Sequence, residues 1–397
     1  MNFIQKTKSI RYGMEFTHGI RRALMSALAL IYFISLGFSV ISITTLFAIS
    51  GIIMLLFEFP TGAIADYDSR KKSLIISFFL FFIAFLGIFL FKNFWLLAGS
   101  WILGDIAWTF STGASSAWVI DALKYAKKKS KIVSLISKGY IFEKSGYFIG
   151  GLLGLIIVAI NFRFIWLLIS LTNLLMMIII WGYMEERNFK PEKVQYNYLM
   201  KSFIKAKESF SYVIHKKNKE LRALMLGGIF AAIAIGSFFT AVPLFFAQIL
   251  NLRPEYISGI YSLSVLFAIV GPFLAEKIAH KKGFRISFFT FFMIMSLAII
   301  VFAFSKSLIL AIVSLTILRI ALASNDVIED SAYQHEFDSK IRASLGSLNS
   351  FNWNIANSIG IFLTGIAISI FGVSHTLILS GVLTFLTGLI YFFGMKK

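Results

Sequence analysis

A short charged turn joins two apolar blocks in the stretch Phe57-Glu58-Phe59-Pro60-Thr61-Gly62-Ala63-Ile64-Ala65-Asp66-Tyr67-Asp68-Ser69-Arg70-Lys71-Lys72. The blocks at 40–65 and 73–91 are almost wholly apolar, and each exceeds or approaches the roughly 20 residues that a helix needs to cross a bilayer. Backbone groups in hydrocarbon must be hydrogen-bonded within their own segment, so such blocks form helices. The stretch therefore predicts two spanning helices that meet at a charged turn.

Blocks of this kind recur along the whole chain. Its 397 residues are 58% hydrophobic and 14% charged, whereas an ordinary soluble domain is about 25% charged. We expect an all-α membrane protein of about twelve transmembrane helices, with spans near 14–36, 40–65, 73–91, 94–120, 136–160, 164–184, 221–249, 255–275, 286–305, 308–330, 343–370 and 376–394. An even number of crossings puts both termini on one side.

The basic residues lie in alternate loops. One set occupies the tails and the segments 70–72, 124–138, 185–222, 277–285 and 340–342, while the opposite loops carry only Lys92, Arg163, Arg253 and Lys306. By the positive-inside rule the first set and both termini are cytoplasmic. The net charge of +19 therefore reflects membrane topology. We expect the protein to lie in a lipid bilayer and to bind no nucleic acid. No cleavable signal peptide is expected.

One long hydrophilic segment divides the chain near its middle. It predicts an N-terminal half at 1–184, a cytoplasmic linker at 185–220 and a C-terminal half at 221–397. Within the linker, apolar residues recur every three or four positions, which predicts an amphipathic helix on the inner membrane face: Leu199, Phe203, Ala206, Phe210 and Val213. This helix could be a plain linker or a regulatory or partner-binding site, and the sequence leaves both alternatives open. A faint repeat between 102–150 and 317–360 favours duplicated halves.

The charged turn resembles the loop signature of the major facilitator superfamily. Gly62, Asp66, Arg70 and Lys71 match it, while Tyr67 and Ser69 depart from it. The segments Gly104-Asp105, Ala117-Trp118-Val119-Ile120-Asp121 and Arg342-Ala343-Ser344 are similar to further parts of a prokaryotic, drug and metabolite efflux-like branch. The resemblance implies two pseudo-symmetric six-helix halves that alternate access to a site between them.

The resemblance also implies a conformational latch made of Gly62, Asp66, Arg70 and Asp121. Gly62 lets helices approach closely, Asp66 docks at a helix N-terminus near Ala343, and Arg70 pairs with Asp121. A solvated turn that merely obeys the positive-inside rule is the alternative.

Ionisable residues inside the predicted spans are candidate functional residues, because a charge at the bilayer centre costs about 2.5–3.5 kcal/mol. Asp105 and Arg319 each lie about eleven residues into a span, at matched depth in the two halves, which fits a central site. A structural pair or two separate charges are the alternatives. Further candidates for substrate binding or proton coupling are Glu143, Lys144, Asp326, Asn352, Trp353 and Asn357.

Several classes of function are excluded or disfavoured. The chain has no cysteine and five scattered histidines, and it lacks nucleotide loops and catalytic triads, so we expect no metal, no cofactor and no enzyme activity. Glycines at 146, 150, 151 and 154 resemble the superfamily's antiporter motif without its proline.

We therefore expect a monomeric secondary active transporter in a prokaryotic plasma membrane. It would move a small organic or amphipathic compound, with proton-coupled efflux, an antiport, as the leading mechanism. Uptake, transport of an anionic lipid-like metabolite, and a non-transporting sensor or assembly partner remain alternatives.

Overall fold

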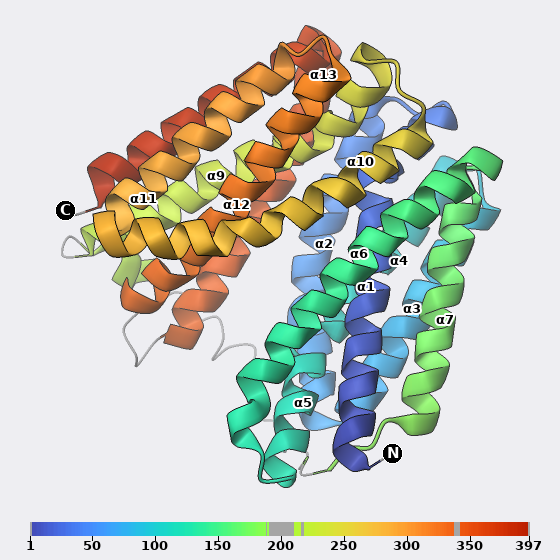
Figure 1. Ribbon diagram of the computed structural model, residues 1–397. Helices are drawn as coiled ribbons and strands as arrows, with labels where there is room; N and C mark the ends of the chain where they lie inside the picture. The colour runs from blue at the N-terminus through green and yellow to red at the C-terminus, as the bar shows by residue number, and fades with distance from the viewer. Residues whose placement is uncertain (1, 188, 190–209, 216–217, 337–341, 396–397) are drawn as a thin grey trace. The chain divides into compact units, whose positions relative to one another are not determined.

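The computed structural model describes residues 2–187, 189, 210–215, 218–336 and 342–395. These residues form two compact units. The first comprises Met1–Phe38, Ser50–Tyr196 and Pro254–Ser262; the second comprises Ser39–Ile49, Asn197–Arg253 and Leu263–Lys397. Each unit is a helical bundle, coloured from blue to green for most of the first and from yellow to red for most of the second (Figure 1).

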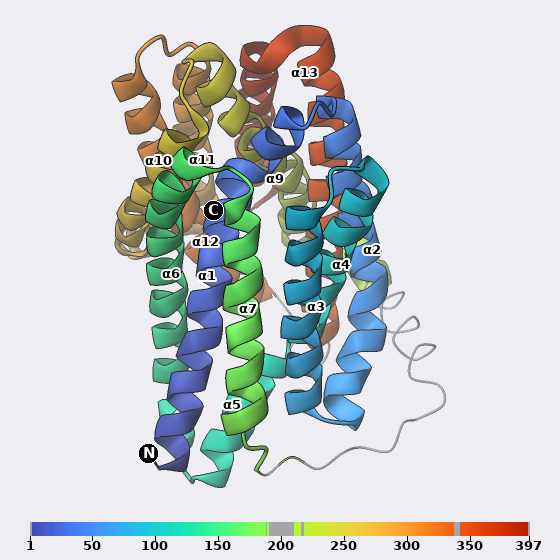
Figure 2. The same cartoon turned by 90° about the vertical axis from the view of Figure 1, so that its right-hand side faces the viewer.

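The first unit is built on seven helices: α1 (Phe3–Ser35), most of α2 (Val40–Tyr67), α3 (Arg70–Leu90), α4 (Phe94–Ser111), α5 (Ala114–Tyr125), α6 (Ile132–Ile160) and α7 (Phe164–Tyr183). Helix α1 packs along α6 and α7, and α3 packs along α4 and α7 (Figure 2). Asn2, Ser69 and Asn93 cap the N-termini of α1, α3 and α4 with their side chains, as short polar residues at these positions do.

The predicted span at 94–120 is not one helix. Helix α4 ends at Ser111, and Gly113 adopts a left-handed backbone with φ of 73° before α5 begins at Ala114. A residue with a Cβ would be strained in that conformation. Gly113 therefore sets the direction of α5 relative to α4.

The second unit contains α9 (Lys219–Leu244), the rest of α10 (Pro254–Phe267), α11 (Gly271–Ala303), α12 (Leu308–Glu336) and α13 (Arg342–Gly394). Helix α9 continues into a π-helical turn at Phe245–Ile249, and a 3-10 turn at Ala268–Val270 joins α10 to α11. Helix α9 packs along α13, and α11 packs against α12 and α13.

Two helices of the second unit are broken by glycines. Gly283 in α11 has φ of 70° and Gly372 in α13 has φ of 78°. The loops predicted at 276–285 and 371–375 thus shrink to sharp bends at single glycines. Glycine is suited to both points because it alone adopts a positive φ without steric cost.

Nine helical segments in the described part of the chain are long and apolar enough to span a membrane. The longest, Leu345–Gly394, holds two spans because Gly372 breaks it. Helices α1 and α4, which carry Arg21, Arg22 and Asp105 in their apolar stretches, complete the set. The prediction of an all-α membrane protein with about twelve spans in two six-helix halves is confirmed.

The predicted amphipathic helix of the linker lies mostly outside the described residues. Leu199, Phe203 and Ala206 belong to the undescribed part, while residues 210–214 are helical.

Candidate functional site

Close packing of α1 against α6 positions the charged residues of the first unit. A Cβ at Gly150 would lie 2.7 Å from Ile20 Cα, and one at Gly146 would lie 3.0 Å from Phe16 Cα. Both glycines therefore let the two helices approach more closely than side chains would allow. This approach brings Glu143, one turn before Gly146, beside α1.

Two arginines of α1 have carboxylate partners. Arg22 Nη1 lies 2.6 Å from Glu143 Oε1, and Arg11 Nη2 lies 2.6 Å from Glu15 Oε1. Glu143 is 5% exposed, whereas the Arg22 side chain is 48% exposed. The predicted site residue Lys144 is exposed, and its Nζ atom lies 3.9 Å from the same carboxylate. The Glu143 charge is thus used mainly by Arg22.

Arg21, between these pairs, is held differently. It is 5% exposed, and its guanidinium lies over the Phe81 ring at 3.8 Å and near the Trp108 ring at 4.9 Å. Among the described residues it forms no ion pair, and its buried Nη1 atom has no hydrogen-bond partner. A guanidinium stacks well on aromatic faces, so two rings take the place of a direct counter-ion.

Asp105 is half-buried in α4. Ser50 of α2 donates a hydrogen bond to its Oδ2 atom at 2.5 Å, and the carboxylate interacts electrostatically with Arg21. Both partners belong to the first unit. Arg319, which the sequence matched with Asp105, belongs to the second unit, so their predicted common site stays a prediction.

His18 and Trp108 fill the space next to Arg21. The His18 Nε2 atom lies 3.3 Å from Ser111 Oγ, and the ring stacks on Phe78 at 5.2 Å and meets the Trp108 ring edge-on at 5.1 Å. Arg22 Cζ lies 5.0 Å from the same Trp108 ring. Trp108 therefore has three basic side chains of α1 around it.

The residues of the predicted latch are placed at the ends of α2, α3 and α5. Arg70 Nη1 lies 3.2 Å from Asp121 Oδ2, and Asp66 is exposed. A Cβ at Gly62 would meet no atom within 4 Å, so the close helix packing expected there is absent from the described residues. The docking of Asp66 near Ala343 would join the two units and stays a prediction.

The first residues of the linker bind to this same end of the first unit. Glu186 accepts hydrogen bonds from the backbone nitrogens of Arg70 and Lys71 at 2.7 and 3.1 Å, at the N-terminus of α3. Glu185 lies between Lys6 and Arg187, and the hydrogen bond from Arg187 holds the pKa of Glu185 below its usual value. These contacts could not be predicted from the sequence, because an acidic pair after a predicted span resembles any solvated loop.

The second unit places the remaining candidates around α9. The Arg319 guanidinium lies 4.4 Å from the Phe239 ring, and Asp326 is exposed on the same helix α12. Asn352 donates to Met225 Sδ at 3.7 Å, and Trp353 packs against the core that includes Met225. In a separate contact Asn357 lies against Gly236 of α9.

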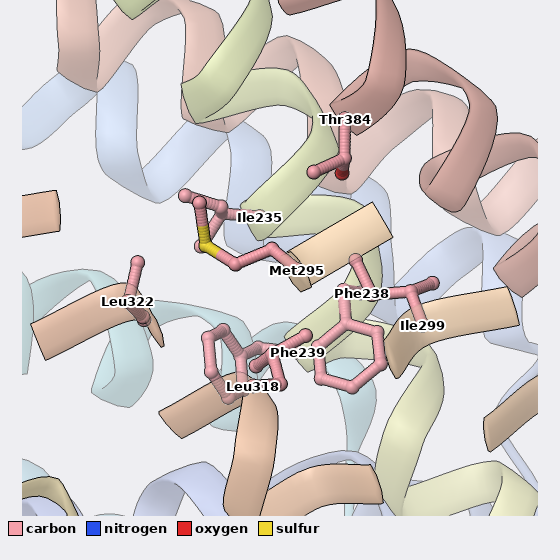
Figure 3. Close-up of a pocket in the computed structure, with 8 residues that line it drawn as sticks. All are labelled: Ile235, Phe238, Phe239, Met295, Ile299, Leu318, Leu322 and Thr384. Carbon is pink, nitrogen blue, oxygen red and sulfur yellow. The ribbon is translucent and has the colours of Figure 1, made fainter. Parts of the chain in front are cut away.

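A small apolar hollow lies among α9, α11, α12 and α13 (Figure 3). The residues that line it are Ile235, Phe238, Phe239, Met295, Ile299, Leu318, Leu322 and Thr384. Its free interior has room for about one water molecule, and it is too small for an organic compound. Phe239 connects this hollow to Arg319.

A group of acids lies near the C-terminal end of α12. The Glu329 carboxyl group interacts electrostatically with Asp326 and Asp330, and Asn325 Nδ2 donates a hydrogen bond to its Oε2 atom at 3.4 Å. Gly228 of α9 lies close to the Tyr333 hydroxyl of the same helix α12, since a Cβ there would lie 3.3 Å from Tyr333 Oη. No group of three metal-ligating side chains occurs in the described ranges.

A family model for the Major Facilitator Superfamily matches residues 14–360. This chain belongs to the major facilitator superfamily. Membership implies a transporter rather than an enzyme. No curated protein matches its sequence.

Solved transporters share its fold. The nucleoside transporter NupG, as its D323A mutant, superposes with a TM-score of 0.82 at 13% identity, with 100% of both chains covered. A bacterial homologue of the iron transporter ferroportin gives 0.79 at 12% identity, with 100% of both chains covered. A bacterial homologue of the human lysosomal transporter Spinster gives 0.78 at 15% identity, covering 99% of this chain and 97% of the other.

The sequence missed Arg21, Trp108 and Ser50 as parts of the candidate site. Arg21 stands next to Arg22 before the apolar second half of α1, and Trp108 follows Asp105 by three residues, hence on the same face of α4. A search for ionisable residues with aromatic neighbours at helical spacing would have selected both.

Proposed function

We propose that this facilitator is a secondary active transporter that couples the movement of a small organic, amphipathic compound to protons by alternating access. The observation that carries the proposal is the Asp105 carboxyl group, which lies half-buried in a spanning helix with Ser50 as hydrogen-bond donor and Arg21 as an electrostatic partner. Such a group is costly to retain in a membrane unless it is used. It has both a partner that favours its ionised form and an apolar setting that favours its protonated form.

Structural neighbours support transport of organic compounds but do not specify the compound. NupG is a nucleoside transporter, and another neighbour is a peptide transporter of the POT family in complex with a thioalcohol-conjugated peptide, with a TM-score of 0.73. At identities of 13% and 16% they share the fold alone. Export in exchange for protons is our leading direction, in line with the resemblance to efflux-like facilitators.

The experiment is substrate-dependent proton flux in proteoliposomes that contain the full chain and a pH-sensitive dye. Nucleosides, dipeptides and aromatic carboxylates are tested under an imposed pH gradient. Asp105→Asn is expected to abolish gradient-driven accumulation and to spare downhill exchange, because the amide keeps the shape and cannot ionise. Glu276→Gln, at an exposed acid of α11, is the matched control. Full coupling in Asp105→Asn would refute the role of Asp105, and absence of any flux would favour a non-transporting sensor.

Uptake of an anionic compound together with protons is the second candidate. The observation that favours it is the group of arginines on α1, of which Arg21 has no carboxylate in direct contact within the described part of the first unit. The sign of the pH gradient that drives accumulation separates uptake from export.

We further propose that the facilitator is a monomer in a prokaryotic plasma membrane, with both termini in the cytoplasm and residues 185–220 as the linker between its halves. The cysteine-free sequence makes topology easy to test. A cysteine at Lys128 should be labelled only from the cytoplasm and one at Lys306 only from outside. Labelling of both from one side would contradict this topology.

A further inference from the structure

The Trp108 cluster consists of Trp108 and three side chains of α1, His18, Arg21 and Arg22. The Arg21 and Arg22 guanidinium carbons lie 4.9 and 5.0 Å from the Trp108 ring, and the His18 ring lies 5.1 Å from it. Arg21 and His18 are almost fully buried, whereas the Arg22 side chain is 48% exposed. The cluster is thus open on the side of Arg22 and closed behind Arg21.

The hydrogen-bonding capacity of this cluster is incompletely used. The buried Nη1 of Arg21 and the buried Nδ1 of His18 both lack a partner among the described residues. Buried polar groups are normally paired, and an unpaired one costs about 1–3 kcal/mol, more when it is charged. Two such atoms in one cluster indicate that a group is still to be bound there.

The charged residues around the cluster indicate the charge of the group that it would bind. Glu143 on α6 pairs directly with Arg22 at 2.6 Å. Asp105 on α4, which takes its hydrogen bond from Ser50, and Glu143 both act on Arg21 without direct contact. Helix α3 contributes only the Phe78 and Phe81 rings to the cluster. Arg11, further along α1, is already neutralised by Glu15. Of the two arginines in the cluster, Arg21 is therefore the one whose positive charge has no carboxylate in direct contact among the described residues.

We propose that the Trp108 cluster binds the anionic group of an aromatic or amphipathic organic anion, which is the transported compound. A guanidinium binds a carboxylate, sulfonate or phosphate through paired N–H groups. The Trp108 face offers a surface for the ring or apolar body of the same compound. Glu143 is then the internal competitor of the anion for Arg22. This inference rests on the proposed function only in taking the bound anion to be the cargo.

Binding to the purified full-length protein in detergent tests the site without any gradient. The probes are 2-naphthoate and its neutral amide, 2-naphthamide, measured by isothermal titration calorimetry. Naphthoate should bind saturably, and the amide should bind at least about tenfold more weakly. Arg21→Gln and Trp108→Leu should each weaken naphthoate binding by about tenfold or more, whereas Glu143→Gln should strengthen it by freeing Arg22.

Two further variants keep the test decisive. Arg163→Gln removes an arginine that contacts the Phe89 ring and backbone elsewhere in the same unit, and it should leave naphthoate binding unchanged. Arg21→Lys keeps the charge but loses the planar fork, so it should bind naphthoate with intermediate affinity, and it guards against a folding defect in Arg21→Gln.

Three results would overturn the inference. They are no saturable naphthoate binding up to about 10 mM, equal affinity for naphthoate and its amide, and unchanged affinity in Trp108→Leu and Arg21→Lys. Because this assay uses no proton gradient, its failure is distinct from a failure of Asp105→Asn to uncouple transport. If Asp105→Asn still couples transport to protons and naphthoate binding is charge-selective, the anion site is supported and the proton mechanism through Asp105 is refuted.

Discussion

Arg70 and Asp121 form an ion pair of 3.2 Å that links the start of α3 to α5, with both side chains largely shielded from solvent. A shielded pair is stronger than an exposed one, because water and salt screen it less. The contact lies at the end of the first unit where Glu186 also binds α3.

If this pair closes the cytoplasmic ends of the helices, Asp121→Asn should open them. We expect faster cysteine labelling from the cytoplasmic side at positions next to the latch, together with slower turnover. The exchanged variant Arg70→Asp/Asp121→Arg should restore part of both. Asp68→Asn is the control, because Asp68 pairs with Lys72 at the exposed surface; an equal effect of this control would argue against a latch.

Enlarging Gly150 should separate α1 from α6. Gly150→Leu places atoms where the Ile20 backbone lies, and overpacking of this kind costs about 1–3 kcal/mol. We expect a lower midpoint of thermal unfolding in detergent and loss of the pairing between Arg22 and Glu143. Gly182→Leu, at a glycine where a Cβ would meet no atom within 4 Å, should change the midpoint little.

Removing the Glu186 carboxylate should loosen the first turn of α3. It accepts from two backbone N–H groups there, and loss of such a cap costs about 0.5–2 kcal/mol. Glu186→Ala is therefore expected to lower the thermal midpoint and to speed amide exchange at Arg70 and Lys71. Exchange rates equal to those of the parent protein at both amides would show that Glu186 is no cap in solution.

The contacts of Glu185 with Lys6 and Arg187 should depend on pH. Its pKa is lowered chiefly by the hydrogen bond from Arg187, with Lys6 adding to it. A carboxyl whose pKa is depressed by folding stabilises the fold above its unfolded pKa and loses that contribution as the pH falls through its folded pKa. The difference in thermal midpoint between the parent and Glu185→Gln should thus persist at neutral pH and vanish below the ordinary Glu value of 4.5.

The spans could be predicted from the sequence because each follows from the length of an apolar block, a property of neighbouring residues. The pair of Arg22 and Glu143 could not, since 121 positions separate them and only the crossing of α1 with α6 brings them together. The break at Gly113 could not be predicted either, and at Gly283 and Gly372 the predicted loops are sharp bends at one residue. Glycine is common in membrane helices, and composition does not distinguish one that bends the chain from one that packs.

The enclosure of Arg21 between the Phe81 and Trp108 rings has a consequence for biosynthesis. When α1 leaves the ribosome, neither ring has yet been made, so two adjacent arginines enter the membrane without their partners. Insertion of a helix with such charges is unfavourable by about 2.5–3.5 kcal/mol for each central arginine. We therefore expect α1 to remain at the translocon or the interface until α3 and α4 emerge, so that the first helix made is not the first to settle in the bilayer.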